Sequence, residues 1–189
     1  MSGDVKRGVL GKDKRFNTEL LLKKNSIQKY FTTIISTHIS KSDKVLDFGC
    51  GPGTFLTATA PLCREIVGVD VSREFVGQCQ KNIALFELTN ASSQIVGEGA
   101  LPFKDNEFDA VILVDVIHHL AEPTKVLKNM LRVIKPGGKI LIYEPNKLNP
   151  LLALIHALDR NEWGLLRLGT PKIYRDLLSP LMKVEKIDY

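Results

Sequence analysis

Cysteine is scarce in this sequence, with three residues in a chain of 189. Cys50, Cys63 and Cys79 are odd in number and show neither a C-x-x-C pair nor the spacing of a metal site. A disulfide framework and a structural zinc site are therefore not expected, and no metal is assigned. Because unpaired thiols suit a reducing compartment, we expect a cytoplasmic protein.

Long hydrophobic runs are also lacking. No stretch approaches the roughly eighteen apolar residues that a membrane helix requires. The polar start, MSGDVKRGVLGKDKR, has no apolar centre of the kind found in secretory signals. The apolar content of 44% and the length are sufficient for one domain with a full core. We therefore expect a single domain over residues 1–189 with no membrane span.

The net charge of +5 is modest, and much of it lies near the N-terminus, at Lys6, Arg7, Lys12, Lys14, Arg15, Lys23, Lys24 and Lys29. Such a patch can meet phosphate groups or an anionic membrane surface, so peripheral membrane association is one interpretation. The favoured alternative is a flexible, solvated arm over residues 1–16 beside a basic helix face, because no aromatic residue interleaves the charges before Phe16.

The most informative stretch is KVLDFGCGPGTFLTATAPLCREIVGVDVS, residues 44–72. Its first five residues predict a buried parallel strand. Three glycines follow at alternate positions, at Gly49, Gly51 and Gly53. Glycine tolerates positive φ and lets a ligand approach the backbone. Residues 54–62 then predict a helix whose free N–H groups point back at that ligand.

A second apolar run, residues 65–69, ends at Asp70. A carboxylate at the tip of a second strand typically binds the two hydroxyls of a ribose, so the combination indicates a nucleoside-binding half-fold. The dinucleotide pattern G-x-G-x-x-G would require glycine at Thr54 or at Leu56, and the pattern G-x-x-x-x-G-K-[ST] is absent. A nucleotide-dependent oxidoreductase is therefore disfavoured, although it remains an alternative.

Four segments together resemble the class I S-adenosylmethionine-dependent methyltransferases. They are VLDFGCGPG, GVDVS, LPFKDNEFDAVILVDVIHHL and VLKNMLRVIKPGGKILIYEPN, and they cover roughly residues 45–146. The likeness is greatest to the small-molecule branch called type 11, which includes quinone-biosynthesis methyltransferases. It implies S-adenosylmethionine as cofactor and an α/β fold: a doubly wound, mainly parallel Rossmann-like sheet with helices on both faces.

The hydrophobic pattern divides the chain into a cap helix over 17–40, a cofactor-binding core over 44–146 and an acceptor-side lid region over 147–182. Within the core we expect a helix capped by Ser72 with Phe75, Cys79, Ile83 and Phe86 on its buried face. A break over residues 89–93 follows it. The remaining core elements are a strand over 94–96, a strand over 108–114, a helix starting at Pro123 and stopped by residues 136–138, and a strand over 139–143.

Beyond the core the sequence predicts a helix over 150–158, a loop over 159–169, a helix over 171–178 and a sixth strand over 183–189. The resembled family completes its sheet with an antiparallel strand. This chain stops before that strand, so we expect a fragment or a sheet edge that is completed otherwise.

The resemblance also assigns the cofactor site. It implies that Asp47 holds the methionyl amino group and that Asp70 binds the ribose. By the same resemblance, the loop under the methionyl tail and the ribose is formed by Gly49, Cys50, Gly51 and Gly53. It also implies that Val71 and Ser72 flank the adenine. Glu98, Gly99 and Ala100 match the adenine-reading loop, and Asp115 and Val116 face the cofactor. For Asp70 the alternative is a helix-capping carboxylate, and for Cys50 it is packing in a tight turn.

His119 is the candidate catalytic residue, because an imidazole suits removal of a proton from an acceptor hydroxyl or amine. The alternative is that both His118 and His119 only pack or cap this segment, which is favoured for His118.

The motifs of DNA-base and protein-arginine methyltransferases are absent, so we expect a small acceptor and no nucleic acid. The segment EPNKLNPLLALIHALDRNEWG resembles methyltransferases of sugar and lipid-linked pathways. Candidate acceptors are a sugar, a quinone or a lipid-linked precursor. A non-catalytic S-adenosylmethionine-binding partner subunit remains the alternative function.

Overall fold

A computed structural model describes residues 32–97, 101–150, 154, 157–158 and 163–187. The expected basic arm and most of the expected cap helix lie outside these ranges. Residues 32–36 are helical and a turn follows them, with Ile35 and Ile39 buried. No helix among the described residues is long and apolar enough to cross a membrane.

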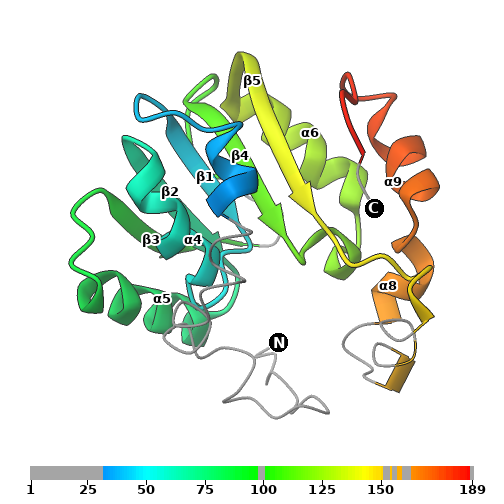
Figure 1. Ribbon diagram of the computed structural model, residues 1–189, viewed down its shortest axis with the longest axis horizontal. Coiled ribbons are helices and arrows are strands. Elements are labelled where there is room, and N and C mark those ends of the chain that lie inside the picture. The colour runs from blue at the N-terminus through cyan, green and yellow to red at the C-terminus, as the bar shows by residue number, and fades with distance from the viewer. Residues whose placement is uncertain (1–31, 98–100, 151–153, 155–156, 159–162, 188–189) are drawn as a thin grey trace.

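A five-stranded parallel sheet organises the molecule (Figure 1). Its spatial order is β3-β2-β1-β4-β5, and the strands are β1 (Lys44–Phe48), β2 (Glu65–Asp70), β3 (Ala91–Ile95), β4 (Phe108–Val114) and β5 (Ile134–Tyr143). The connecting and following helices are α4 (Thr54–Thr59), η1 (Ala60–Leu62), α5 (Arg73–Leu85), η2 (Ile117–His119), α6 (Pro123–Val133), α8 (Trp163–Leu168) and α9 (Pro171–Leu178).

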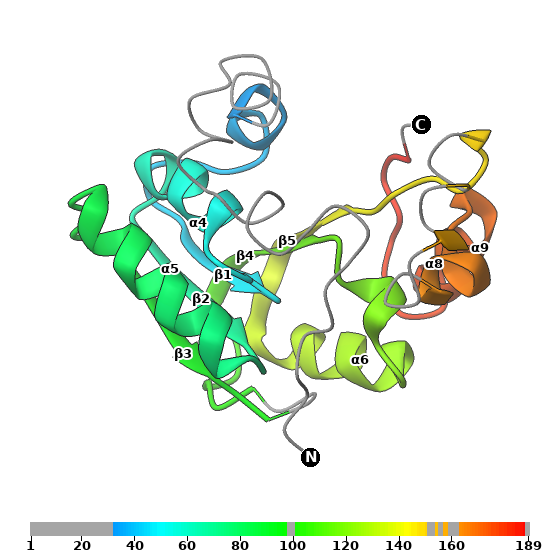
Figure 2. The same cartoon turned by 90° about the horizontal axis from the view of Figure 1, so that it is seen from below.

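Helices cover both faces of this sheet (Figures 1 and 2). Alternate residues of a strand point to opposite faces, so Val45 packs with Leu56 of α4 and Cys79 of α5, whereas Leu46 packs with the cluster that contains Leu127 of α6. Residues of α9 join the α6 side. The predicted α/β, doubly wound parallel fold is confirmed.

Two strands differ from the prediction. β3 begins at Ala91, so the expected break over 89–93 lies partly in a strand. β3 is an edge strand with one neighbour, and its serines pair with β2 through their backbones while the side chain of Ser92 stays exposed. β5 begins at Ile134 and runs through Pro136–Gly138, where the pairing with β4 is irregular and Gly137 has φ 78°. An edge strand tolerates proline at such a position.

The buried face of α5 is also rotated from the predicted one. Val76, Cys79 and Asn82 are buried, whereas Phe75 is half-buried and Phe86 is exposed. The side-chain amide of Asn82 donates a hydrogen bond to the carbonyl of Pro52 at 2.8 Å. The buried face of α5 therefore includes a polar contact with the glycine loop, which apolar spacing alone does not reveal.

The C-terminal segment agrees with the prediction only in part. α9 has the predicted bounds, and Thr170 caps it by accepting a hydrogen bond from the N–H of Ile173. The loop predicted over 159–169 is wrong, because residues 163–168 form α8. The strand predicted over 183–189 is also wrong for residues 183–187, which form no strand. Leu181, Met182 and Val184 instead pack against the core cluster beneath α9.

Candidate functional site

The candidate site lies at the carboxyl ends of the parallel strands, where loops after β1, β2, β4 and β5 meet. Figure 2 views the molecule from this side. Open parallel α/β sheets bind ligands at this end, near the point where the strand order reverses. In this sheet the reversal lies between β1 and β4.

The glycine loop after β1 is shaped by three left-handed residues, with φ of 74° at Gly49, 52° at Gly51 and 86° at Gly53. A Cβ at Gly49 would lie 2.5 Å from a methyl carbon of Val116, and one at Gly53 would lie 2.6 Å from the sulfur of Cys79. A Cβ at Gly51 would meet no atom of the described chain within 4 Å. With respect to the described residues, the loop is therefore packed on two sides and open at Gly51.

Asp70 ties this loop to the end of β2. Its Oδ2 accepts the N–H of Gly51 at 2.9 Å, and its Oδ1 accepts the N–H of Ser72 at 2.8 Å. The residue that caps α5 is Ser72, whose hydroxyl oxygen accepts the N–H of Phe75. Asp70 thus supports the cap rather than forming it. Each carboxylate oxygen keeps a further lone pair that can accept a ribose hydroxyl.

Asp47 is a buried carboxylate near the end of the central strand, with 2% of its surface exposed. Its Oδ2 has no hydrogen-bond partner within the described part of the chain. Burial, followed by the proximity of Cys79 and Asp70, raises the pKa of Asp47 well above its ordinary value. A buried carboxylate without a partner is costly, and an ammonium group supplies the missing partner. The expected cofactor carries such a group, so the residue fits it.

Cys50 is buried in the glycine loop that follows β1. Its hydrogen bond with Cys79, together with burial, raises the pKa of the Cys50 thiol. A thiol that stays protonated is a poor nucleophile. This supports packing, rather than catalysis, as the reason for a small side chain here.

The segment after β4 forms the opposite wall of the loop. Asp115 adopts a left-handed φ of 60°, unusual for a residue other than glycine, and its N–H donates to the carbonyl of Tyr143 at 2.9 Å. Val116 is buried against Gly49. The structure therefore places Val116 against the glycine loop. That Asp115 and Val116 face the cofactor stays a prediction.

Glu144, which follows β5 directly, was not among the residues predicted from the sequence. Its side chain is 3% exposed and forms four hydrogen bonds. Oε1 accepts the N–H groups of Val116 and Ile117 at 2.8 and 2.6 Å. Oε2 lies 2.6 Å from His118 Nδ1 and 3.2 Å from the hydroxyl of Tyr174. The available signal was an acidic residue at the carboxyl end of a strand, in the segment ending YEPN.

The two histidines have different environments. His118 is buried, and its ring nitrogens face Glu144 at 2.6 Å and Asp115 at 3.7 Å. His119 is exposed, and its ring centroid lies 3.9 Å from that of His118. One atom from each of Asp115, His118 and His119 that could coordinate a metal ion lies within 4.8 Å of the other two. The sequence spacing did not suggest this grouping. Of the two ring nitrogens of His118, Nδ1 is already in hydrogen-bonding contact with Glu144, and Nε2 is the one that faces Asp115.

The remaining predicted residues divide into two groups. Val71 is exposed and Ser72 is half-buried, both in the turn after β2. Glu98, Gly99 and Ala100 lie outside the described residues. Their assignment to the adenine therefore stays a prediction.

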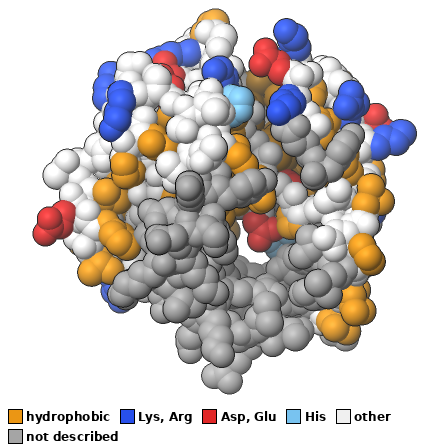
Figure 3. All heavy atoms as spheres, viewed as in Figure 1, with side chains coloured by type: hydrophobic (Ala, Val, Ile, Leu, Met, Phe, Trp, Pro, Cys, Tyr) orange, Lys and Arg blue, Asp and Glu red, His pale blue; other side chains and the backbone are white. Residues whose placement is uncertain are grey.

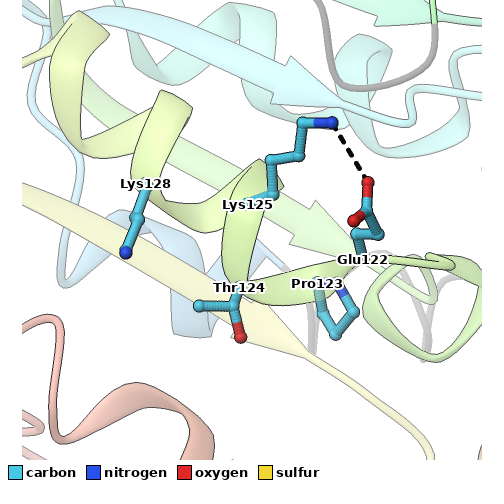
Figure 4. Close-up of a pocket in the computed structure, with 5 residues that line it drawn as sticks. All are labelled: Glu122, Pro123, Thr124, Lys125 and Lys128. Atoms are coloured by element: carbon cyan, nitrogen blue, oxygen red, sulfur yellow. Dashed lines mark hydrogen bonds and ion pairs between the residues drawn. The ribbon is translucent and has the colours of Figure 1, made fainter.

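A separate surface hollow of about 500 Å³ lies at the start of α6 (Figure 4). Its lining residues are Glu122, Pro123, Thr124, Lys125 and Lys128. All five come from the first two turns of one helix and the residue before it, so this hollow lacks the convergent loops of the carboxyl-end site. In Figure 3, many of the lysine and arginine side chains of the described residues lie toward the upper part of this view.

Comparison with known proteins agrees with this geometry. A family model described as "Methyltransferase domain" matches residues 46–142. The ubiquinone/menaquinone biosynthesis C-methyltransferase UbiE of Pasteurella multocida is 31% identical over 157 residues, which cover 80% of this chain and 58% of that protein. The ubiquinone biosynthesis O-methyltransferase of Methylococcus capsulatus is 30% identical over 114 residues, covering 60% and 48%.

Among solved structures, a SAM-dependent methyltransferase from Aquifex aeolicus superposes with a TM-score of 0.61 at 23% identity. The match covers 70% of this chain and 74% of that one, and at this identity it shows the fold. The chain spans about half the length of three of the curated relatives it matches, between 45 and 58%. The family match extends from the central strand to the end of β5 and includes the glycine loop, Asp70 and the segment after β4. The chain therefore belongs to the class I S-adenosylmethionine-dependent methyltransferases, in the type 11 branch.

Proposed function

We propose that this protein transfers a methyl group from S-adenosylmethionine to a small-molecule acceptor in the cytoplasm. The observation that carries the proposal is the arrangement of Asp70 and the glycine loop. The carboxylate of Asp70 fixes the N–H of Gly51 at 2.9 Å and leaves the open side of the loop beside itself. A ribose bound to Asp70 is thereby directed along the loop toward Asp47.

The cofactor's parts correspond to different residues of the site. Asp47 binds the methionyl ammonium group, and Asp70 accepts the ribose hydroxyls in charge-assisted hydrogen bonds worth roughly 1.5–3 kcal/mol each. Val71 and Ser72 flank the adenine, and the loop with Glu98, Gly99 and Ala100 reads its edge. The exposure of Val71, an apolar side chain, supports a contact with a flat apolar ring.

The reaction is an in-line displacement, in which the acceptor atom attacks the methyl carbon and the sulfonium leaves as a neutral thioether. The sulfonium is already a good leaving group, so the protein mainly positions the acceptor and excludes water. Asp115 and Val116 form the wall near the transferred methyl. His119, exposed beside Asp115, takes the proton of an acceptor hydroxyl or amine where one must be removed.

An apolar acceptor, such as a quinone or a lipid-linked precursor, is favoured over a sugar. The region after β5 exposes several large apolar side chains at 51–68% of their surface, namely Leu148, Leu154, Leu158 and Trp163. Several exposed large apolar side chains in one segment of the chain favour an apolar binding partner. The relative from Pasteurella multocida, named for ubiquinone and menaquinone biosynthesis, supports the same class of acceptor.

The test begins with calorimetric titration of S-adenosylhomocysteine into the wild type and an Asp70→Ala variant, with NADH as a control ligand. We expect micromolar binding that the variant loses, and no binding of NADH. A folded wild type that fails to bind would refute the proposal, and binding of NADH would revive the oxidoreductase alternative.

An acceptor screen then separates an enzyme from a non-catalytic partner subunit. Demethylated quinones, isoprenoid-linked phenols and sugars are incubated with radiolabelled S-adenosylmethionine. We expect methylation of an apolar acceptor and a loss of rate in His119→Ala when the acceptor is protonated. A protein that binds cofactor but methylates nothing would favour the partner subunit.

A further inference from the structure

Glu144 joins two parts of the molecule that are distant in sequence. On one side it accepts the N–H groups of Val116 and Ile117, in the segment that follows β4. On the other side it accepts the hydroxyl of Tyr174, which comes from α9. A buried carboxylate in this position is stabilised only while both sets of donors stay in place.

The C-terminal helices make two further contacts with the segment after β4. The guanidinium of Arg167, in α8, donates to the carbonyl of Leu120 at 2.9 Å. Gly164 lies so close to η2 that an added Cβ would clash with the carbonyl oxygen of His118, 1.7 Å away. α8 and α9 are therefore docked onto η2 by a hydrogen bond, a close backbone approach and the Tyr174–Glu144 bond.

The segment after β4 also contacts the glycine loop. A methyl group of Val116 occupies the space where a Gly49 Cβ would lie. Glu144 holds the backbone N–H of Val116 at 2.8 Å. A continuous series of contacts thus runs from Tyr174 through Glu144 and Val116 to Gly49.

We propose that Glu144 is a positioning residue that couples docking of α8 and α9 to cofactor binding. With Tyr174 and Glu144 joined, Val116 is held against the glycine loop and the cofactor site is formed. When α9 separates, the carboxylate loses a donor and the wall at Val116 relaxes. Coupling of this kind is reciprocal, so bound cofactor also stabilises the docked helices. This proposal rests on cofactor binding at the carboxyl end of the sheet, as set out under Proposed function.

Two conservative variants test the coupling by calorimetry with S-adenosylhomocysteine. Tyr174→Phe removes only the hydroxyl, and Glu144→Gln removes the charge with little change of shape. We expect each to raise the dissociation constant about 5- to 20-fold. The matched control is Asp176→Asn, an exposed acid on the same helix whose partner is Lys172. It should bind within twofold of the wild type.

Hydrogen exchange distinguishes positioning from a role in fold stability alone. In the wild type, S-adenosylhomocysteine should slow amide exchange in α9, and in Glu144→Gln this protection should largely disappear. Gly164→Ala, which forces α8 away from His118 without touching the glutamate, should weaken affinity in the same direction.

A different pattern would overturn the proposal. Suppose that Tyr174→Phe lowers the urea midpoint and still binds S-adenosylhomocysteine as tightly as the wild type does. If, in addition, the ligand does not slow amide exchange in α9, Glu144 only stabilises the fold. A wild type that does not bind the ligand would overturn the proposed function as well, which separates the two failures.

Discussion

At the residue scale, the carboxylates at the carboxyl end of the sheet differ by their hydrogen-bond partners. Glu144 has four donors and Asp70 has two backbone donors, whereas Oδ2 of Asp47 has none in the described chain. A carboxylate that is fully satisfied supports structure, and one that is buried without a donor is costly unless a ligand pairs with it. Asp47 is therefore the residue whose replacement should separate stability from binding.

We expect Asp47→Asn to stabilise the ligand-free protein and to weaken cofactor binding. Burial, with Cys79 and Asp70 nearby, raises the pKa of Asp47, so the folded protein holds this proton more tightly than the unfolded chain does. Stability then falls as pH rises from the ordinary aspartate pKa through the raised value. At pH 7 the variant should gain about 1–2 kcal/mol in urea unfolding, the order of an unpaired buried group, and lose at least tenfold in S-adenosylhomocysteine affinity. A destabilised variant with unchanged affinity would contradict this account.

Two glycines of one loop should respond differently to the same substitution. Gly49→Ala places a methyl group 2.5 Å from Val116, so we expect a loss of about 2–4 kcal/mol in urea unfolding, partly restored by Val116→Ala. Gly51→Ala meets no atom of the described chain and should cost only about 1–2 kcal/mol of backbone strain. Because its methyl group enters the open side of the loop, it should weaken S-adenosylhomocysteine binding more than its stability loss suggests. Equal effects of both variants on stability would refute this distinction.

At the scale of elements, apolar periodicity predicted the helices and strands that have a local sequence signal. It missed those that form through contacts with residues distant in the sequence. The strand over 108–114 and the helix over 171–178 have their predicted bounds, because a continuous apolar run and a Thr-Pro start are local signals. The polar strand β3 forms because β2 supplies its hydrogen bonds, and α8 packs against η2. Glu144 was missed for the same reason, since its four donors come from two other segments.

The rotated face of α5 leads to a prediction at this scale. Asn82 is buried, and its amide donates to the carbonyl of Pro52 in the glycine loop. We expect Asn82→Ala to cost about 1–3 kcal/mol in urea unfolding, because it leaves that carbonyl without its donor and opens space in the core. Lys81→Ala, at an exposed position of the same helix, is the control and should change stability by less than about 0.5 kcal/mol. An Asn82→Ala variant as stable as the control would show that the bond contributes little.

At the scale of the whole molecule, the two ends of the sheet carry their charges in different ways. At the amino end the charges are paired: Lys44 bridges Glu65 and Glu107 at 3.0 Å each, and Asp109 lies 2.6 Å from Lys135. At the carboxyl end, Oδ2 of the buried Asp47 has no hydrogen-bond partner in the described chain, and Asp115, which faces His118 at 3.7 Å, has a left-handed backbone. Pairing lowers energy in the folded protein, whereas unpaired and strained groups persist mainly at functional sites.

Asp109→Asn should therefore affect stability and leave cofactor binding unchanged. Burial opposes ionisation of Asp109, but hydrogen bonds from Lys135 and from the N–H of Lys44 outweigh it and lower the pKa of the carboxyl group. The stabilisation is present at neutral pH and is lost as pH falls through the ordinary aspartate pKa to the lowered value in the folded protein. We expect a loss of about 1 kcal/mol in urea unfolding at pH 7 that shrinks at acid pH, with S-adenosylhomocysteine affinity within twofold of the wild type. Weakened binding in this variant would show that the two ends of the sheet are energetically coupled, because Asp109 lies at the opposite end of β4 from the cofactor loops.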